Sequence, residues 1–315
     1  MSVYKICGNS FASSIPIPEL QLADNLEPAF HFQLCCEPRD FSAVGSWINQ
    51  WELPDGEIWL AFAKLETEYL LQFPQLANFV VSMDGRSVDC YPQPNVPVET
   101  VRHLLLNQVI PLVLSHLGKT ILHTSACLGS GGVMAFMGMT GSGKSTLAAS
   151  FALRGLPIIT DDCLLAEEQA GMVHCVASYP GSRLWDESIE ALFAVEPDGQ
   201  NVAHYSDKKR LVVGQPIDEE TFPLHAVYAI AEPEEEESTE VTITALTATE
   251  ALLEIVKHSF QLDNTDRSRI RQAFKQFEQI AKVVPFFRLT YPRDFALLAT
   301  VQNTVLAHLD QIVLP

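Results

Sequence analysis

The sequence has no uninterrupted apolar segment long enough to cross a membrane. Its longest apolar stretch covers 101–118 and contains an arginine, two histidines, an asparagine and a proline. Such groups are costly to place in ~30 Å of hydrocarbon. The first residues, MSVYKICGNSFASS, also lack the basic start and the apolar run of roughly 7–15 residues that an export signal has. We therefore expect a cytoplasmic protein that has no membrane partner.

Positive charge is scarce. Lysine and arginine number 20 against 39 aspartate and glutamate residues, which gives a formal net charge of −19. Such a protein repels a polyanion over roughly a Debye length, so we expect no nucleic acid partner. Any phosphate that it binds must be held by local geometry. The acidic run EPEEEESTE at 232–240 separates two strand-like segments and predicts a solvated hairpin loop.

The cysteines do not have the spacing of a disulfide framework or a zinc cluster. There are seven of them, an odd number, and no C-x-x-C pair occurs. Disulfide-rich domains and zinc sites both depend on paired, regularly spaced cysteines. We therefore expect reduced and mostly buried thiols.

The composition is that of a globular protein of about two domains. Apolar residues make up 47% of the 315 residues and charged residues 19%, and a domain takes roughly 100–200 residues. Residues 1–95 read as short strands and loops and predict a small α+β N-terminal domain of unknown role. Its predicted strands lie at 30–36, 57–65, 68–73 and 78–85. The segment YPQPNVP at 91–97 marks the boundary, because its three prolines continue neither a helix nor a central strand.

Apolar periodicity predicts alternating helices and strands over the second domain, residues 96–315. A helical pattern begins near Leu104 and ends at Gly118, although Pro111 should kink or split this helix. Thr247 and Glu250 form a capping-box signature for a later helix. The other predicted elements are strands at 120–128, 133–137, 157–160 and 286–291, helices at 146–154 and 265–281, and a last helix near the end of the chain.

A complete phosphate-binding motif lies between a predicted strand and a predicted helix. The pattern G-x-x-x-x-G-K-[ST] is matched by Gly138, Met139, Thr140, Gly141, Ser142, Gly143, Lys144 and Ser145, and Thr146 follows in the helix. In such a loop backbone N–H groups and the helix N-terminus surround a phosphate chain. Lys144 would contact the β- and γ-phosphates and Ser145 would ligate Mg²⁺. The alternative is a glycine-rich turn with an incidental lysine.

Two carboxylates follow at the end of the next predicted strand. Because strand ends in open α/β sheets face the ligand crevice, Asp161 and Asp162 should both point at the phosphate site. One could hold Mg²⁺, a role assigned to Asp162, and one could accept a proton from an attacking hydroxyl. Which of the two is the base stays open. The alternative is a pair of aspartates that cap or turn the chain.

Residues 122–168 resemble the catalytic domain of HPr kinase/phosphorylase and its HPr kinase-like relatives. The resemblance rests on LHTSA, GMTGSGKST, a helix ending in RGLP, and IITDDCLLAEE. The spacing from the glycine-rich loop through the helix and the next strand to the aspartate pair is unusually short. A looser similarity runs through YPGSRLW at 179–185, DKKR at 207–210 and YPRD at 291–294. The resemblance implies an α/β P-loop kinase domain of the HPr kinase/PEP carboxykinase type. It also implies that His123, which takes the place of the family's upstream histidine, lies near the transferred phosphate. The alternative is a core histidine on a buried strand.

Four basic residues are candidates for spreading the charge of phosphoryl oxygens. They are Arg183, Lys208, Lys209 and Arg210, and an arginine has this role in other phosphoryl transfers. The alternative is a basic triplet on a solvated face. We favour a site role for one of the four.

Together these residues predict a kinase that uses ATP and Mg²⁺ and phosphorylates a serine-like hydroxyl of a protein or peptide. Two alternatives stay open: a nucleotide-binding regulatory ATPase module and a kinase for a small hydroxyl metabolite. The three hypotheses differ in the fate of the ATP phosphate, which is transferred to an acceptor, released to water or merely bound. The sequence leaves open the acceptor, a reverse phosphorylase reaction and the formation of a homo-oligomer.

Overall fold

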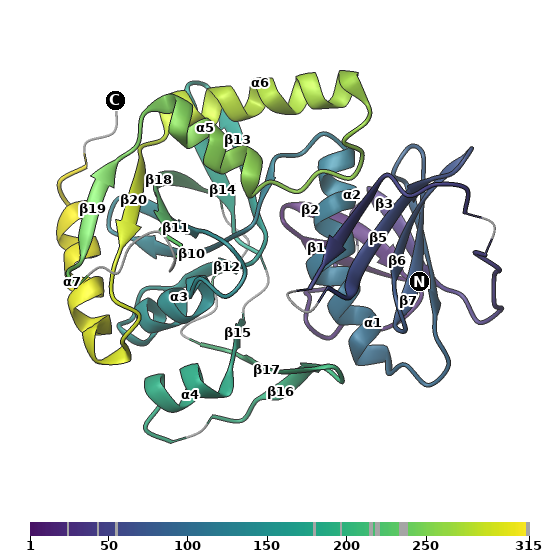
Figure 1. The fold of residues 1–315 in the computed structure, drawn as a ribbon, viewed down its shortest axis with the longest axis horizontal. Helices are drawn as coiled ribbons and strands as arrows, with labels where there is room; N and C mark the ends of the chain where they lie inside the picture. Colours follow the sequence, from purple (N-terminus) through teal and green to yellow (C-terminus); the bar gives the residue numbers. More distant parts are fainter. Residues whose placement is uncertain are drawn as a thin grey trace. The chain divides into compact units, whose positions relative to one another are not determined.

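The computed structural model divides the chain into two compact units (Figure 1). The first comprises Met1–Leu117, Ala203–Tyr205 and Gln261–Asp266, and the second comprises Gly118–Val202, Ser206–Phe260 and Arg267–Pro315. The structure describes all residues except 24, 43, 54–55, 179–180, 196, 214–216, 218–220, 233–238 and 313–315. Most of the predicted acidic loop at 232–240 and the start of YPGSRLW therefore lie outside the described residues.

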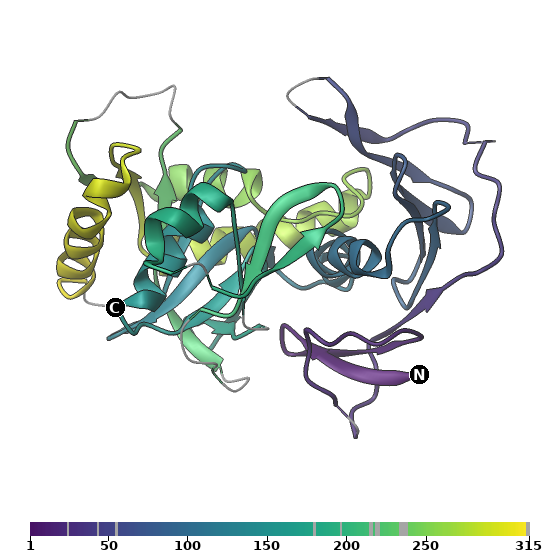
Figure 2. The ribbon, with the colours of Figure 1, turned by 90° about the horizontal axis from the view of Figure 1, so that it is seen from below.

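An eight-stranded sheet forms most of the first unit. Its strand order is β1-β2-β3-β8-β7-β6-β5-β4, and the β1–β2 and β4–β5 hairpins lie at its opposite ends (Figure 2). The pairs β2–β3 and β3–β8 are parallel. The predicted strands correspond to β3, β5, β6 and β7. The strands are β1 (Ser2–Ile6), β2 (Asn9–Ser13), β3 (Phe30–Leu34), β4 (Asn49–Glu52), β5 (Ile58–Lys64), β6 (Glu68–Phe73), β7 (Ala77–Ser82) and β8 (Ser87–Pro92).

The helical segment after the prolines belongs to this first unit. It consists of α1 (Val98–Leu104), a π-helical turn (Leu105–Val109) and α2 (Ile110–His116). The disruption predicted at Pro111 takes the form of this wide turn, because proline has no N–H for the regular helical ladder. Nε2 of His116 lies 2.8 Å from the carbonyl oxygen of Met83, which joins α2 to the loop after β7. The division between the units thus falls after Leu117, whereas the sequence placed it at 95.

A short stretch from late in the chain completes the first unit. Asp263 is buried, and its Oδ2 accepts hydrogen bonds from Lys64 Nζ at 2.7 Å and from Tyr69 Oη at 2.8 Å. This contact depends on residues almost two hundred positions apart, which is why no local pattern predicted it.

A nine-stranded sheet is the framework of the second unit. The path β12-β10-β11-β18-β14-β13-β9 is extended by β20, which pairs with β18, and by β19, which pairs with β20. β10 is antiparallel to both β11 and β12, so these two strands run in the same direction and end at the same edge. The strands are β9 (Ile121–Leu122), β10 (Thr124–Gly129), β11 (Gly132–Met137), β12 (Ile158–Asp161), β13 (Leu164–Gln169), β14 (Met172–Val176), β18 (Thr221–Ile230), β19 (Thr242–Ala245) and β20 (Phe286–Thr290).

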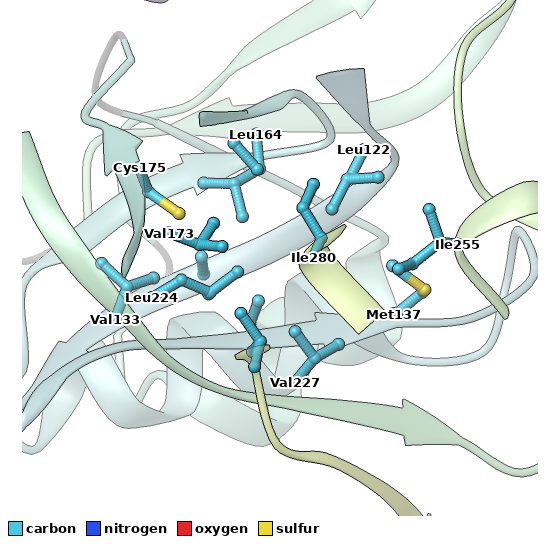
Figure 3. Close-up of a cluster of buried hydrophobic side chains, with 14 of the residues drawn as sticks. Leu122, Val133, Met137, Leu164, Val173, Cys175, Leu224, Val227, Ile255 and Ile280 are labelled. Atoms are coloured by element: carbon cyan, nitrogen blue, oxygen red, sulfur yellow. The ribbon is translucent and has the colours of Figure 1, made fainter. Parts of the chain in front are cut away.

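Helices cover both faces of this sheet because its central strand is apolar on both sides. Val133, Ala135 and Met137 of β11 pack with α5 (Ala248–Lys257) and α6 (Arg267–Val283), as Figure 3 shows for part of this cluster. Met134 and Phe136 pack on the other face with α3 (Lys144–Leu153) and α7 (Leu298–Leu309). This alternation is the period of two that a strand imposes. The second unit therefore has a mixed α/β architecture.

Smaller elements complete the second unit. β15 (Ser182–Leu184), β17 (Ser206–Leu211) and β16 (Gln200–Ala203) form a three-stranded sheet in that order, and α4 (Asp186–Leu192) follows β15. The predicted capping box of α5 is confirmed, because the Thr247 side chain accepts from the Glu250 N–H and Glu250 accepts from the Thr247 N–H. The seven cysteines form no disulfide, and five of them are buried. Of the helices in the described part of the chain, none is long and apolar enough to span a bilayer.

Candidate functional site

The glycine-rich loop joins the C-terminal end of β11 to the start of α3. β11 ends at Met137 and α3 begins at Lys144, so the loop has a strand before it and a helix after it, as the sequence predicts. Gly141 and Gly143 have φ angles of 83° and 90°, left-handed values that glycine adopts at little cost. These two residues let the loop turn tightly above the helix N-terminus.

Lys144 folds back over this loop. Its Nζ donates hydrogen bonds to the carbonyl oxygens of Gly138 at 2.7 Å and Met139 at 2.9 Å. The residue is 5% exposed, and this burial lowers the pKa of Lys144 to about 8, although the charges of Asp162 and Asp161 act to raise it. An ammonium group has three N–H donors. The two contacts with the loop leave one donor for a phosphate oxygen.

Asp161 is the last residue of β12, and its carboxylate is enclosed. Oδ1 accepts from Ser125 Oγ at 2.6 Å, and Oδ2 accepts from the backbone N–H of Arg183 at 2.8 Å. The side chain is 1% exposed. No local pattern indicated a role for Ser125, because the pairing of β10 with β12 is what places it opposite Asp161. Asp161 is thus placed to hold neighbouring groups in position.

Asp162 differs from its neighbour in conformation and in exposure. Its φ angle is 86°, a left-handed value that is uncommon outside glycine and that concentrates at functional sites. The side chain is 21% exposed, and Oδ1 lies 3.8 Å from His123 Nε2. Burial acts to raise the pKa of Asp162, but the positive charge of Arg183 beside it prevails and holds this pKa well below its ordinary range. Asp162 is therefore a carboxylate with open surface.

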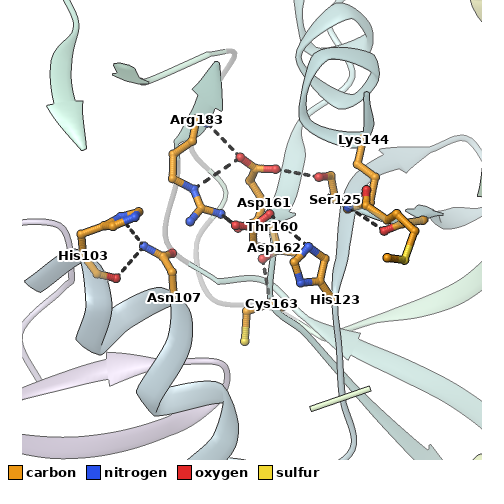
Figure 4. A network of polar contacts seen from close by, with 12 residues as sticks. His103, Asn107, His123, Ser125, Lys144, Thr160, Asp161, Asp162, Cys163 and Arg183 are labelled. Atoms are coloured by element: carbon orange, nitrogen blue, oxygen red, sulfur yellow. Dashed lines mark hydrogen bonds and ion pairs between the residues drawn. The ribbon is translucent and has the colours of Figure 1, made fainter. Parts of the chain in front are cut away.

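Arg183 connects the two aspartates, as Figure 4 shows. It lies on β15, and its side chain is 5% exposed. Its guanidinium forms an ion pair with Oδ2 of Asp162 and donates to the backbone carbonyl of Asp161 at 3.0 Å. A planar guanidinium with five N–H donors suits such a double contact. Arg183 thereby fixes the positions of the two carboxylates relative to each other.

His123 lies between β9 and β10, on the side of Asp162 that faces away from Arg183 (Figure 4). Its backbone N–H donates to the carbonyl of His258 at 2.7 Å, and its ring stacks on Phe260 with centroids 5.7 Å apart. Burial lowers the pKa of His123 to about 4, although Asp162 acts to raise it. The imidazole is therefore neutral at pH 7.

The basic triplet on β17 is only partly associated with this cluster. Lys208 Nζ lies 5.0 Å from the centroid of the Trp185 ring, and its charge acts on Asp162. Lys209 pairs with Asp186 at 3.0 Å. Arg210 stands opposite Arg183 in the pairing of β15 with β17. Among the four basic candidates, Arg183 contacts both aspartates.

The remaining predicted loop residues surround Lys144. Met139 and Thr140 are exposed, and Ser145 is half-buried in the first turn of α3. The Oγ1 of Thr146 lies 2.9 Å from Ser188 Oγ on α4. Ser142 Oγ is buried and has no hydrogen-bond partner among the described residues. A buried hydroxyl without a partner is what a site for a polar ligand would leave in the free protein.

The residues present suit a magnesium ion that is held mainly by nucleotide phosphates. The described residues contain no cluster of three or more His, Cys, Asp or Glu side chains that could hold a metal by themselves. Mg²⁺ in nucleotide sites is typically bound through one or two protein ligands, phosphate oxygens and waters. The Ser145 hydroxyl and the open carboxylate of Asp162 are the side chains that could supply such ligands.

No family model and no curated protein matches the chain. A distant likeness exists to the structure of the HPr(Ser) kinase/phosphatase from Coxiella burnetii, with a TM-score of 0.31 and 11% sequence identity. The match covers 60% of this chain and 98% of that chain.

Proposed function

We propose that the second unit is a kinase that binds ATP and Mg²⁺ at residues 138–146 and phosphorylates a serine hydroxyl of a protein or peptide. The observation that carries the proposal is Asp162. It is a partly exposed carboxylate in a left-handed backbone conformation, and its charge acts on the lysine of the glycine-rich loop. A carboxylate and an ammonium so placed are the groups that phosphoryl transfer to a hydroxyl needs.

Phosphoryl transfer depends mainly on positioning and charge neutralisation. When bound, ATP would supply the phosphoryl group and Mg²⁺ would offset the charge of its oxygens. The loop N–H groups and Lys144 would bind the phosphates, and the Ser145 hydroxyl would hold the metal ion. Lys144 can keep its two contacts with the loop while it donates its third hydrogen bond.

Asp162 is the better candidate for accepting the proton of the attacking hydroxyl. Its Oδ2 is paired with Arg183, but the side chain is 21% exposed, whereas that of Asp161 is 1% exposed and accepts hydrogen bonds from Ser125 and from the Arg183 N–H. Asp161 is then a positioning residue that acts through Arg183. The neutral ring of His123 borders Asp162 without adding a positive charge at pH 7.

The test separates binding from transfer. Calorimetry with ATP and Mg²⁺ measures affinity, and radiolabelled ATP added to a cell lysate with the protein reports where phosphate goes. Asp162→Asn should retain nucleotide affinity and lose transfer by roughly 10²–10⁴-fold, the usual contribution of a general base. If Asp162 instead holds Mg²⁺, the same variant also loses Mg²⁺-dependent affinity. Asp310→Asn is the matched control, since Asp310 contacts Ser130 on an exposed surface.

The fate of the label decides among the three hypotheses. Labelled phosphoserine on a protein or peptide supports the proposal. Label in a soluble metabolite favours a metabolite kinase, and label only in inorganic phosphate favours a regulatory ATPase. A wild-type protein without nucleotide affinity at millimolar ATP contradicts all three.

A further inference from the structure

A residue far from the motif in sequence contacts the glycine-rich loop. Arg293 lies in the segment YPRD that follows β20. Its NH1 donates a hydrogen bond to the backbone carbonyl of Ser142, and its NH2 donates to the carbonyl of Ala231 at 2.7 Å. Ala231 directly follows β18, the parallel neighbour of β11. Arg293 therefore connects the loop to the adjacent central strand.

Tyr291 holds this guanidinium in place. The centre of the Arg293 guanidinium lies 4.8 Å from the Tyr291 ring centroid, and NH1 lies 3.1 Å from the tyrosine hydroxyl. A Cβ atom built on Gly143 would lie 3.2 Å from that hydroxyl and 3.3 Å from NH1. The pair thus packs directly against the backbone of the loop, at the residue that precedes Lys144.

We propose that Arg293 is a positioning residue that holds the glycine-rich loop in its phosphate-binding conformation through the Ser142 carbonyl. When that carbonyl accepts from Arg293, the peptide unit between Ser142 and Gly143 has one orientation. The N–H of this unit belongs to Gly143, and backbone N–H groups at this position of such a loop are the ones that bind phosphate. This inference rests on the proposed function and adds a residue to the same site.

The arginine acts through the backbone rather than as a phosphate ligand. Its hydrogen bonds go to two carbonyl oxygens and to the tyrosine hydroxyl. A guanidinium presents its donors in a fixed planar fork whose two ends can reach carbonyls on different segments, whereas the donors of a lysine ammonium all diverge from one nitrogen atom. Geometry, and not charge alone, should therefore decide whether a substituted residue supports the loop.

The experiment compares Arg293→Ala, Arg293→Lys and a control in the full chain. Arg293→Ala should bind ATP at least about tenfold more weakly, equivalent to about 1.4 kcal/mol. Its loop amide hydrogens at 139–143 should also exchange faster without nucleotide. Methylguanidinium added at millimolar concentration should restore both properties, because Arg293 is exposed and the small cation can reach its place. Arg154→Ala is the control, since Arg154 bonds to Gln302 and Asn303 at the other end of α3.

The outcomes distinguish this inference from the proposed function. Weak binding in both Arg293 variants, with rescue of the alanine variant only, supports the positioning role. An Arg293→Lys variant that binds like wild type overturns it, because charge alone then suffices. Arg293→Ala with unchanged affinity and exchange overturns it while the proposed function stands. Loss of folding in the alanine variant leaves the lysine variant to decide, and a wild-type protein that binds no nucleotide overturns both.

Discussion

Replacing Lys144 by methionine should make the unliganded protein more stable at pH 7 while it abolishes nucleotide binding. Methionine has a similar length and no charge, so it can fill the same space above the loop. The expectation follows from the burial of Lys144, which is 5% exposed and whose ammonium group contacts two carbonyl oxygens. A group that a ligand needs can reduce the stability of the protein without that ligand.

The magnitude follows from the pKa. A pKa of about 8, against the ordinary 10.5, corresponds to about 3 kcal/mol lost on burying the charged form, at about 1.36 kcal/mol per pH unit. The substitution also removes the hydrogen-bond donor of the Gly138 and Met139 carbonyls, which costs roughly 1 kcal/mol each. A net gain of about 1 kcal/mol in the free energy of unfolding remains.

The gain should depend on pH with a definite sign. Between pH 8 and 10.5 Lys144 is deprotonated in the folded protein and protonated in the unfolded chain, so the wild type becomes more stable as the pH rises through this window. The methionine variant lacks this rise. Its advantage should therefore disappear near pH 9 and reverse towards pH 10.

Urea unfolding of both proteins at pH 7, 8, 9 and 10 measures this difference. Lys119→Met is the control, because Lys119 pairs with Glu167 and keeps 36% of its side chain exposed. The control should show no comparable pH dependence relative to the wild type. The reasoning is refuted if Lys144→Met is clearly less stable than wild type at pH 7, or if the difference between the two is the same at every pH.

Three further predictions concern the same unit. The wild type should lose stability as the pH falls from 6.5 to 4, because His123, with its pKa of about 4, stays neutral in the folded protein while the unfolded chain takes up a proton. In thermal melts the His123→Gln variant should lose less stability over this range, and an equal loss contradicts the prediction. Gly143→Ala should lower the free energy of unfolding by about 1–2 kcal/mol, because residue 143 has a left-handed backbone, and it should also weaken ATP binding. Gly171→Ala is the control, since Gly171 has a φ of 85° in open space, and it should lower stability without changing ATP binding. Thr247→Ala should cost about 1 kcal/mol in urea unfolding with unchanged ATP affinity, and a weaker affinity would show that the cap is coupled to the site.

Local patterns predicted most helices and strands, and tertiary contacts decided what the patterns left open. In the first sheet, apolar periodicity predicted β3, β5, β6 and β7 but not β1, β2, β4 and β8. In the second unit it predicted α3, α5, α6 and α7 but not α4, and the cap of α5 follows from Thr247 and Glu250. The boundary between the units did not follow, because prolines interrupt secondary structure whether or not a unit ends there. The π-helical turn before Pro111 was foreseen only as a disruption, since its form depends on how the chain on both sides packs.

The aspartate pair shows why the sequence left the candidate base undecided. Two adjacent aspartates at the end of a strand are equivalent in a one-dimensional pattern. In the fold, Asp161 keeps the strand conformation and is enclosed by Ser125 and Arg183, while the left-handed backbone of Asp162 leaves its carboxylate partly exposed. These partners come from β10 and β15, one before and one after the pair in the chain. The difference between the two carboxylates is therefore a property of the sheet arrangement. Exchanging Ser125 should alter Asp161 before it alters Asp162, whereas exchanging Arg183 should alter both.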